Sequence, residues 1–431
     1  MRFTFAFGKS GLTLDLPGRH RYQFLEARSA TPLGDPDAAL EEALRRPIAS
    51  QPLAELAAGR DSVAISVCDI TRPVPNAGIL RFVLREIEAA GIKKEKITIL
   101  IATGLHRPAS EAEIREIVGD RVASSYRVVN HYARNLSEHR FLGHTSTGTP
   151  VYIDERFVSA GLRLTIGFIE PHLMLGYSGG RKLVAPGLAA QETIKVLHSP
   201  RFMRDPRTHE GSIEDNPLHR ELLEIAAMAG HEFIVDVALA RDRRIAGVFA
   251  GHPVEAHREG VRFVSQVMLE LLDEPVDAVI TTSAGYPLDL TFYQAVKGIT
   301  AAQHILKPGG KILLLAACQE GPGAEEFRNM LRQAPPAGQF LEQIAGKPVI
   351  VDQWQMEKLA LVTEKYDIIY YVPCLPAEYY PALWGEAFAS AEDALGALDA
   401  SLATESSIAL IPEGPYVLAK VRNQQPQQAS R

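Results

Sequence analysis

Residues 62–73 read SVAISVCDITRP, and residues 97–108 read ITILIATGLHRP. Each stretch begins with a run of mostly apolar, often β-branched residues and ends in a polar turn. Such runs are typical of strands that are buried on both faces of a parallel sheet. Between them, apolar side chains recur with helical spacing from about Asn76 to Ala90, and Gly91 follows where a helix commonly ends. A strand, a helix and a second strand in this order predict an α/β fold.

The same alternation continues along the chain. A pair of short strands is predicted around Gly8 to Gly11, and a capping box of Ser110 and Glu113 predicts a further helix start. Longer helices are predicted at about 217–229 and 254–272. The remaining predicted strands are 126–130, 151–153, 163–168, 232–240, 278–282, 311–316, 349–351, 368–372 and 407–411.

A break near Asp273-Glu274-Pro275 divides this pattern. We therefore predict an N-terminal α/β domain over residues 1–273 and a C-terminal α/β domain over residues 274–415, both with parallel-rich sheets. Residues 416–431 are predicted to pack back on the protein and then to end in a disordered tail, because residues 424–431 read QQPQQASR.

Composition excludes several classes of protein. The chain has 431 residues, a net charge of -7 and no basic block, so nucleic acid is not an expected partner. No apolar stretch reaches the length of a membrane span, and the N-terminus lacks the pattern of a signal peptide. The three cysteines are far apart, which argues against a disulfide framework or a cysteine-rich zinc site and fits a reducing cytoplasm.

Polar residues directly follow four of the predicted strands. In open α/β sheets, ligands bind beyond the carboxyl ends of the strands. We therefore expect these four turns to line one cleft. The turns are residues 69–72, 104–106, 170–172 and 283–286.

The segment 169–200 is the richest in candidate functional groups. It reads IEPHLMLGYSGGRKLVAPGLAAQETIKVLHSP. Its glycines allow the backbone to approach an anion closely, and Arg181 and Lys182 add positive charge. The P-loop pattern is absent, so an ordinary flexible loop with solvated cations remains an alternative.

Three histidines accompany these turns: His106, His172 and His198. Histidine is the usual acid or base near neutral pH and the commonest metal ligand, although any one of the three could serve only the fold. In the turn of residues 69–72, Asp69 could simply cap the turn. Alternatively, Arg72 is placed to bind a carboxylate or a phosphate through two hydrogen bonds.

A predicted helix start at residues 291–298 carries another candidate group. Tyr293, Gln294 and Lys297 span one helical turn and share a face. An ordinary amphipathic helix explains this pattern equally well, but the neighbouring turn of residues 286–289 favours a binding site.

These residues together resemble the lactate racemase family, whose members carry a nickel pincer nucleotide. The resemblance spans roughly residues 1–420. It rests on His198 and its spacing and on the segments DITRP (69–73), GLHRP (104–108), EPHLMLGYSGGRK (170–182) and YQAVKG (293–298).

The resemblance implies two α/β domains with an active-site cleft between them, the N-terminal one binding the cofactor. The cofactor is a pyridinium mononucleotide with two sulfur-containing arms. Lys182 matches the lysine that is covalently joined to one arm, and His198 matches the protein ligand of the nickel ion. The resemblance also implies cofactor-maturation enzymes as partners.

The resemblance implies the remaining roles as well. His106 and His172 match the catalytic acid/base pair. Asp69, Ile70, Thr71 and Arg72 match the turn that contacts the cofactor. Gln294 and Lys297 match positions that bind cofactor and substrate, Arg72 and Tyr293 would also bind substrate, and Trp354 corresponds to an aromatic residue lining the site.

The function implied is racemisation or epimerisation of a 2-hydroxy acid by reversible hydride transfer to the cofactor, through a 2-keto acid. Three alternatives remain open: a non-catalytic carrier of the nickel nucleotide, a Schiff-base enzyme at Lys182, and a zinc hydrolase that uses His172 and His198. Retention of both His106 and His172 argues against a carrier, and the absence of HExxH-type spacing argues against the hydrolase.

Overall fold

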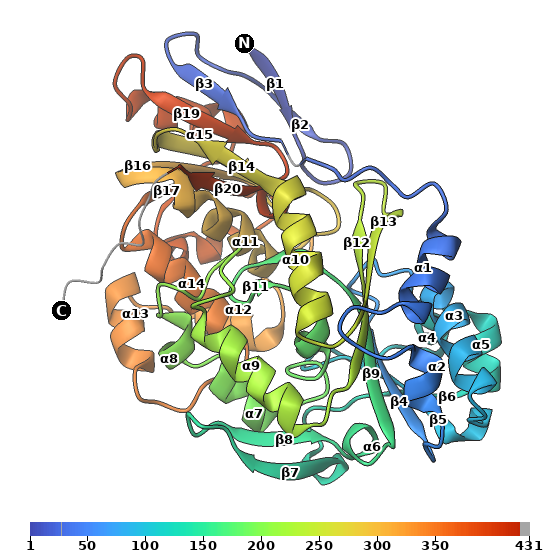
Figure 1. Ribbon diagram of the computed structural model, residues 1–431. Helices are drawn as coiled ribbons and strands as arrows, with labels where there is room; N and C mark the ends of the chain where they lie inside the picture. Colours follow the sequence, from blue (N-terminus) through green and yellow to red (C-terminus); the bar gives the residue numbers. More distant parts are fainter. Residues whose placement is uncertain (27, 423–431) are drawn as a thin grey trace. The chain divides into compact units, whose positions relative to one another are not determined.

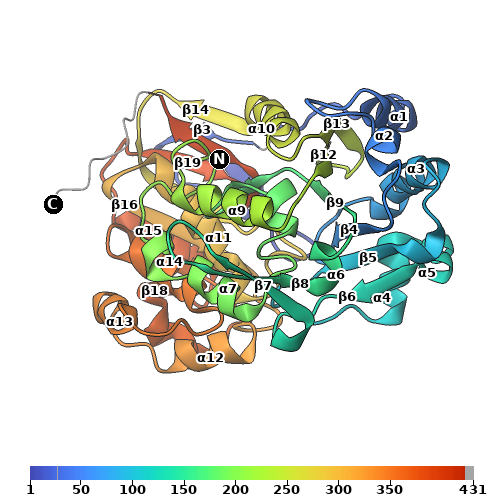
Figure 2. The same ribbon diagram turned by 60° about the horizontal axis from the view of Figure 1, so that its bottom comes forward.

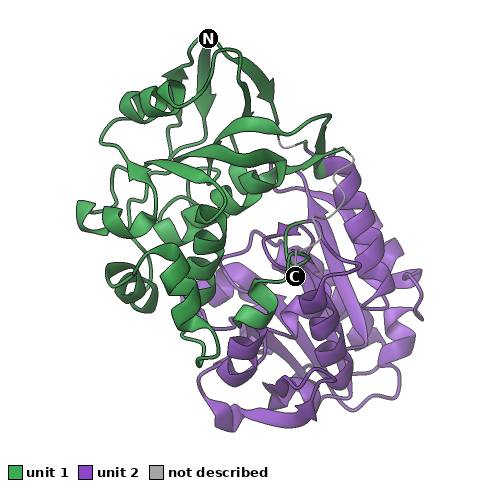
Figure 3. Ribbon diagram, turned by 90° about the vertical axis from the view of Figure 1, so that its left-hand side faces the viewer, with its two compact units in different colours: residues 1–28, 198–210, 268–431 green, residues 29–197, 211–267 purple. Residues whose placement is uncertain are grey.

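The computed structural model describes residues 1–26 and 28–422 (Figure 1). The chain divides into two compact units, which are coloured separately in Figure 3. Unit 1 comprises residues 1–28, 198–210 and 268–431, and unit 2 comprises residues 29–197 and 211–267. The crossing at residue 268 lies close to the break predicted near 273. Residues 1–28 and 198–210, which the sequence pattern assigned to the N-terminal domain, group with the C-terminal part of the chain.

Unit 2 is built on a six-stranded sheet in the order β13-β12-β9-β4-β5-β6. All neighbouring pairs are parallel except β12 with β13, which closes one edge as an antiparallel hairpin. The strands are β4 (Val63–Cys68), β5 (Ile97–Ala102), β6 (Arg127–Asn130), β9 (Leu162–Phe168), β12 (Phe233–Leu239) and β13 (Ile245–Gly251).

Both faces of this sheet are covered. One face packs against five helices in a common apolar core: α1 (Pro36–Arg45), α2 (Leu53–Ala57), α3 (Asn76–Ala89), α4 (Glu111–Val118) and α5 (Asp120–Ser125). The other face receives a short 3-10 helix, η3 (Gly180–Leu183), which contacts β4, β9 and β12. Helix α9 (Pro217–Met228), which is labelled in Figure 2, packs on η3 in turn. The glycine-rich segment is therefore held against the sheet.

The other elements of unit 2 lie around this sheet. They are the pairs β7 (His139–His144) with β8 (Pro150–Asp154) and β10 (Pro171–His172) with β11 (Gly176–Tyr177), and the helices α6 (Glu155–Val158), α7 (Gln191–Leu197) and α10 (Glu255–Met268).

Unit 1 contains a second six-stranded sheet, which is parallel throughout, in the order β18-β17-β16-β15-β19-β3. The strands are β3 (Arg21–Phe24), β15 (Val276–Thr282), β16 (Leu306–Leu315), β17 (Asp367–Tyr371), β18 (Glu386–Ala387) and β19 (Ser407–Ile411). Because β3 comes from the N-terminal residues and pairs with β19, the start of the chain belongs to this unit.

Helices and a hairpin cover the two faces of this second sheet. One face packs against α11 (Phe292–Ala302), α12 (Glu325–Arg332), α13 (Ala337–Ile344) and α14 (Gln353–Thr363). The other face packs against α15 (Ala391–Ala400) and the hairpin of β1 (Arg2–Phe5) and β2 (Leu12–Asp15). The unit also holds α8 (Pro200–Met203) and a parallel pair of β14 (Leu269–Leu272) with β20 (Leu418–Val421).

The predicted α/β class with two parallel-rich sheets is confirmed. Two local predictions are wrong. Residues 269–272 form β14 and do not continue the preceding helix, because they pair with β20. Residues 349–351 form no strand. In the C-terminal segment, β20 pairs with β14, and the tail predicted at 424–431 lies outside the described residues.

None of the helices in the described ranges combines the length and the apolar character that crossing a bilayer requires.

Candidate active site

The order of strands in unit 2 reverses direction between β4 and β9. From β4 the chain runs outward through β5 and β6 on one side, while β9, β12 and β13 lie on the other side. This reversal is a topological switch point, where open α/β sheets bind ligands. Three of the four predicted polar turns follow β4, β5 and β9, which are neighbours in the sheet. The fourth turn follows β15, in unit 1.

Asp69 and His106 form a hydrogen-bonded pair at this position. The His106 Nδ1 atom lies 2.7 Å from the Asp69 Oδ2 atom. The other carboxylate oxygen of Asp69 accepts hydrogen bonds from the backbone N–H and the hydroxyl of Thr71, at 3.2 and 2.6 Å. Burial opposes ionisation of Asp69, but the hydrogen bonds from His106 and Thr71 outweigh it and lower the pKa of the carboxyl.

This pairing fixes the proton on the imidazole ring of His106. An ionised carboxylate only accepts hydrogen bonds, so the Nδ1 atom of His106 carries the proton that faces Asp69. In the neutral ring, the Nε2 atom then holds a lone pair. The side chain of His106 is 55% exposed while that of Asp69 is 7% exposed. A solvent-exposed base is therefore hydrogen-bonded to a buried carboxylate. This arrangement suits general base catalysis.

Lys182 is held on the opposite face of the sheet from α3. Gly179 and Gly180 adopt positive φ values of 87° and 46°, which turn the chain into η3. The Ser66 hydroxyl of β4 donates a buried hydrogen bond of 2.9 Å to the carbonyl of Leu183 and fixes η3 on the strand. The Lys182 side chain is half-buried, and no hydrogen bond or ion pair joins its amine to another described residue.

The surroundings of Lys182 favour the neutral amine. Burial, and then the positive charge of nearby Arg72, lower its pKa from 10.5 to about 8. The acidic residues Asp69 and Glu170 offset part of this effect. A lysine with a lowered pKa is a stronger nucleophile at neutral pH and is suited to a covalent link with a cofactor.

Arg181 does not add a cation to an anion site, as the sequence suggested. Its side chain is only 1% exposed, and it donates hydrogen bonds to the carbonyls of Leu175 and Tyr177, at 3.1 and 2.8 Å. Arg181 therefore shapes the glycine-rich segment from within. Asp236 lies beneath the same segment: a Cβ atom on Gly179 would meet its carboxylate at 2.5 Å, so glycine is required there.

His172 lies in the short hairpin of β10 and β11, where it is paired with Gly176. Its Nδ1 atom accepts long contacts of 3.4 Å from the backbone N–H groups of Met174 and Leu175. In the neutral ring, this places the proton on Nε2. His106 and His172 thus have opposite neutral tautomers: Nε2 of His106 can accept a proton, whereas Nε2 of His172 carries one.

In unit 1, the His198 ring packs against an aromatic side chain of α14. The rings of His198 and Trp354 have centroids 4.4 Å apart. The Trp354 indole N–H donates to the Tyr293 hydroxyl at 3.1 Å, and the Gln355 amide donates to the Tyr293 carbonyl at 2.8 Å. His198 is thereby connected to α11, which carries the predicted binding residues of this unit.

The start of α11 carries those residues. Thr291 caps the helix by accepting a hydrogen bond from the N–H of Gln294. The amide oxygen of Gln294 is shielded from solvent and has no hydrogen-bond partner among the described residues. Such an atom can accept a hydrogen bond from a ligand. Lys297 follows one turn later and is half-buried. The adjacent Asp289 serves the fold, because its carboxylate accepts from the N–H groups of Gly8 and Ala317.

The residues in these clusters cannot form a metal site alone. Within residues 1–26 and 28–422, no group of three or more His, Cys, Asp and Glu side chains could hold a metal ion. Nickel bound at His198 would require most of its donors from the cofactor, and sulfur and imidazole are both suitable for nickel.

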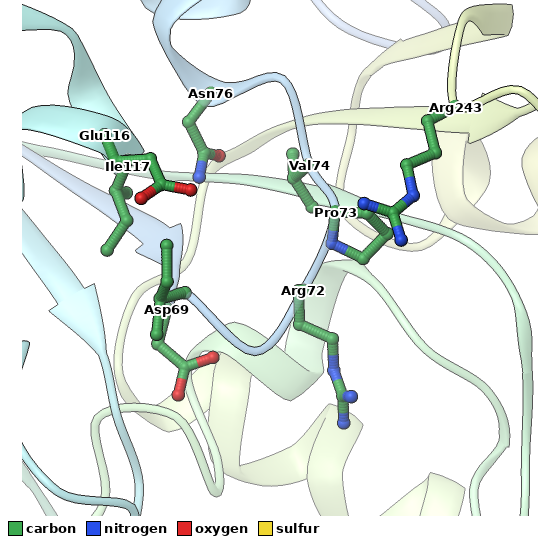
Figure 4. A pocket seen from close by; sticks show the side chains of 9 residues that line it. Asp69, Arg72, Pro73, Val74, Asn76, Glu116, Ile117 and Arg243 are labelled. Carbon is green, nitrogen blue, oxygen red and sulfur yellow. The ribbon is translucent and has the colours of Figure 1, made fainter. Parts of the chain in front are cut away.

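Sequence reasoning missed two side chains near the switch point. Asn76 and Arg243 line the same pocket as Asp69 and Arg72 (Figure 4). Asn76 follows the DITRP motif by only three residues and could have been noticed, whereas Arg243 comes from a distant hairpin.

Two family models match consecutive parts of this chain. The model described as the lactate racemase N-terminal domain matches residues 7–211, and the lactate racemase C-terminal domain matches residues 272–419. The lactate racemase of Thermoanaerobacterium thermosaccharolyticum is 32% identical over 420 residues, which cover 96% of this chain and 98% of that protein. The chain belongs to the lactate racemase family.

A second lactate racemase and two solved structures are also similar to this chain. The lactate racemase of Lactiplantibacillus plantarum is 33% identical over 387 residues, covering 88% of this chain and 90% of that protein. The solved lactate racemase apoprotein from T. thermosaccharolyticum matches with a TM-score of 0.91 and 31% identity, covering 97% of this chain and all of that one. A Thermotoga maritima protein of known structure shares the fold alone. It is 18% identical, with a TM-score of 0.67 and coverage of 91% of this chain and all of that one.

Proposed function

We propose that this protein is a racemase or epimerase of a 2-hydroxy acid. The observation that carries the proposal is the Asp69–His106 pair, which presents an oriented base beside the lysine with a lowered pKa at a ligand-binding edge of the sheet. Relatives that are lactate racemases, at 32–33% identity, support the reaction type and suggest a short 2-hydroxy acid such as lactate as the substrate.

Family membership implies the nickel pincer nucleotide, and the residues fit it. Lys182 offers an amine without a hydrogen-bond partner among the described residues, and His198 offers an imidazole ligand. We assign Lys182 to the covalent link and His198 to the nickel ion. When bound, the cofactor supplies a reversible acceptor for the hydride at C2 of the substrate.

The protein side chains then handle the hydroxyl proton. His106 takes this proton through Nε2 as C2 is oxidised to the 2-keto acid, and Asp69 stabilises the resulting imidazolium. His172 acts in its protonated form: it donates a proton to the oxygen when the hydrogen comes back on the other face and becomes neutral, while His106 releases its proton to solvent. Arg72 and Lys297 hold the carboxylate, and Tyr293 and Gln294 orient the substrate. These roles require an active-site cleft between the domains, which stays a prediction.

A carrier that only stores the cofactor would require Lys182 and His198 but no oriented base. The Asp69–His106 pair therefore favours catalysis over storage.

The test is an assay of the protein produced together with cofactor-maturation enzymes. A panel of single-enantiomer 2-hydroxy acids, including lactate, aromatic acids, malate and sugar acids, is incubated with the loaded protein, and the opposite enantiomer or epimer is measured by chiral chromatography. We expect interconversion of at least one acid, loss of this activity in His106→Ala, and retention in His144→Ala, an exposed histidine of β7. Absence of turnover in fully loaded protein refutes catalysis and leaves the carrier.

A further inference from the structure

The segment that carries His198 is held within unit 1 by buried charged side chains. It comprises residues 198–210, which share the colour of the C-terminal part of the chain in Figure 3, and we call it the His198 segment. Helix α8 begins directly after His198: the carbonyl of Ser199 accepts the backbone N–H groups of Phe202 and Met203, each at 3.0 Å. Whatever fixes this short hydrogen-bonded turn therefore also fixes the path of the chain at His198.

One face of helix α14 contacts the His198 segment. Trp354, Glu357 and Lys358 are three and four positions apart, so their side chains project from the same face of the helix. The Trp354 ring packs on that of His198, with centroids 4.4 Å apart. The Glu357 carboxylate, which is fully buried, accepts a hydrogen bond of 2.6 Å from Nε of Arg204. The same face of α14 thus contacts the chain both before and after α8.

Lys358 makes a third contact, through a buried ammonium group. It is 8% exposed, and its Nζ atom donates to the carbonyls of Met203 at 3.0 Å and Thr208 at 2.9 Å. Both carbonyls belong to the backbone of the His198 segment. An ammonium group removed from water is costly unless its donors are paired. Because two carbonyls five positions apart must converge on one ammonium group, Lys358 restricts the path of the chain between them.

Acidic side chains compensate the charge of Lys358. Burial lowers its pKa to about 8, and the carboxylates of Glu210, Glu357 and Asp205 offset part of this effect. Glu210, the last residue of the His198 segment, is itself buried and accepts a hydrogen bond of 2.9 Å from Nε2 of His304. An apolar side chain of similar length would fill the same space without the cost of burying a charge, so packing alone does not account for a lysine here.

We propose that Lys358 is a positioning residue for His198. Its ammonium group fixes the end of α8 on α14 through the Met203 and Thr208 carbonyls. The fixed turn then holds the imidazole of His198 against Trp354, in the position from which it binds a metal ion. The inference rests on the proposed function in assigning the nickel ion to His198.

The first measurement is the fluorescence of Trp354 in the cofactor-free protein. Trp384→Phe leaves Trp354 as the only tryptophan of the chain. An imidazole ring in contact with an indole quenches the indole fluorescence, so His198→Ala should raise the emission and gives the value for a lost contact. Lys358→Met, which keeps the side-chain length but removes the donors, should raise the emission toward that value. Lys358→Gln, which keeps a polar side chain at the buried position, is measured in the same way in case Lys358→Met does not fold.

The matched control is Lys365→Met, which removes an exposed lysine just beyond the end of α14. Its emission should equal that of the parent protein. Circular dichroism and thermal melting establish that each variant is folded at the temperature of the measurement. A lysine that served only stability would lower the melting temperature of Lys358→Met and leave the Trp354 emission of the folded protein unchanged.

The second measurement is nickel retention by the cofactor-loaded protein at graded concentrations of a chelator, followed by metal analysis. Lys358→Met should hold nickel about tenfold more weakly than the parent protein, the order of effect expected when a group that orients a metal ligand is removed. Lys365→Met should hold it equally well. Because the metal is measured directly, this result does not depend on turnover.

The outcomes separate this inference from the proposed function. Unchanged Trp354 emission in the folded Lys358 variants overturns the proposal. So does unchanged nickel retention in Lys358→Met, where His198→Ala itself loses nickel. Tight nickel retention in His198→Ala would instead refute the assignment of His198 in the proposed function, and the emission of Trp354 would still decide whether Lys358 positions the ring.

Discussion

The reactivity of Lys182 is a quantitative consequence of its surroundings. Burial and the charge of Arg72 lower its pKa from 10.5 to about 8. At pH 7 an amine with the lower value is neutral in roughly one molecule in eleven, against about one in three thousand at 10.5. The neutral fraction, which is the nucleophile, therefore rises about 300-fold. Arg72→Gln should raise the pKa, but not to 10.5, because burial is the larger cause.

The assay is brief acylation of the cofactor-free protein from about pH 6 to about pH 11.5, followed by digestion and mass spectrometry of the peptide containing Lys182. The pH midpoint of the labelling rate gives the pKa, and the same peptide labelled in denatured protein gives the reference near 10.4. We expect a midpoint near 8 in the folded protein and a higher one in Arg72→Gln. A folded midpoint equal to the denatured one would mean that the surroundings of Lys182 do not lower its pKa.

Three further predictions follow from the same contacts. Asp69→Asn should lower the turnover number roughly 10²- to 10⁴-fold, the range of general acid–base catalysis, while the cofactor adduct measured by mass spectrometry persists; loss of the adduct would reassign Asp69 to cofactor binding. His106→Ala and His172→Ala should each stop interconversion with unchanged nickel content in metal analysis, and nickel loss would make them ligands. Burial raises the pKa of Asp236 to about 7, so its stabilising contribution is present below its unfolded value near 4 and is lost as pH rises through 7. The difference in melting temperature between Asp236→Asn and the parent protein should therefore increase in favour of the variant from pH 5 to pH 8. A difference that does not change with pH would mean that the pKa of Asp236 is not raised.

Apolar runs predicted most strands of both sheets, because a parallel strand that is buried on both faces needs apolar side chains on both. The edge strands β3, β13 and β18 were not predicted. Residues 97–102 are β5 as predicted, and the capping box of Ser110 and Glu113 is present. Residues 269–272 were mistaken for helix because their spacing continues that of α10. Their strand character comes from β20, nearly 150 positions later, which local patterns do not contain.

The candidate site was predictable as a set of turns but not as a set of contacts. Glycines and histidines after apolar runs indicated residues 104–106 and 170–182. That Asp69 supports His106 follows only from β4 and β5 being neighbours in the sheet. The burial of Arg181 depends on how its segment folds back on itself, and the sequence showed only a charge beside Lys182. Arg243 is 171 positions from Arg72, so only the folded chain brings them to one pocket.

If this protein inverts C2 of a 2-hydroxy acid through hydride transfer, the Asp69-supported His106 moves only the hydroxyl proton, and the hydrogen at C2 never exchanges with water. Substrate labelled with deuterium at C2 is incubated with loaded protein in ordinary water, and the inverted product is analysed by mass spectrometry. We predict that the product retains the deuterium at C2. Replacement of this deuterium by solvent hydrogen at the rate of inversion would mean that a base removes the C2 proton, and it would contradict the account.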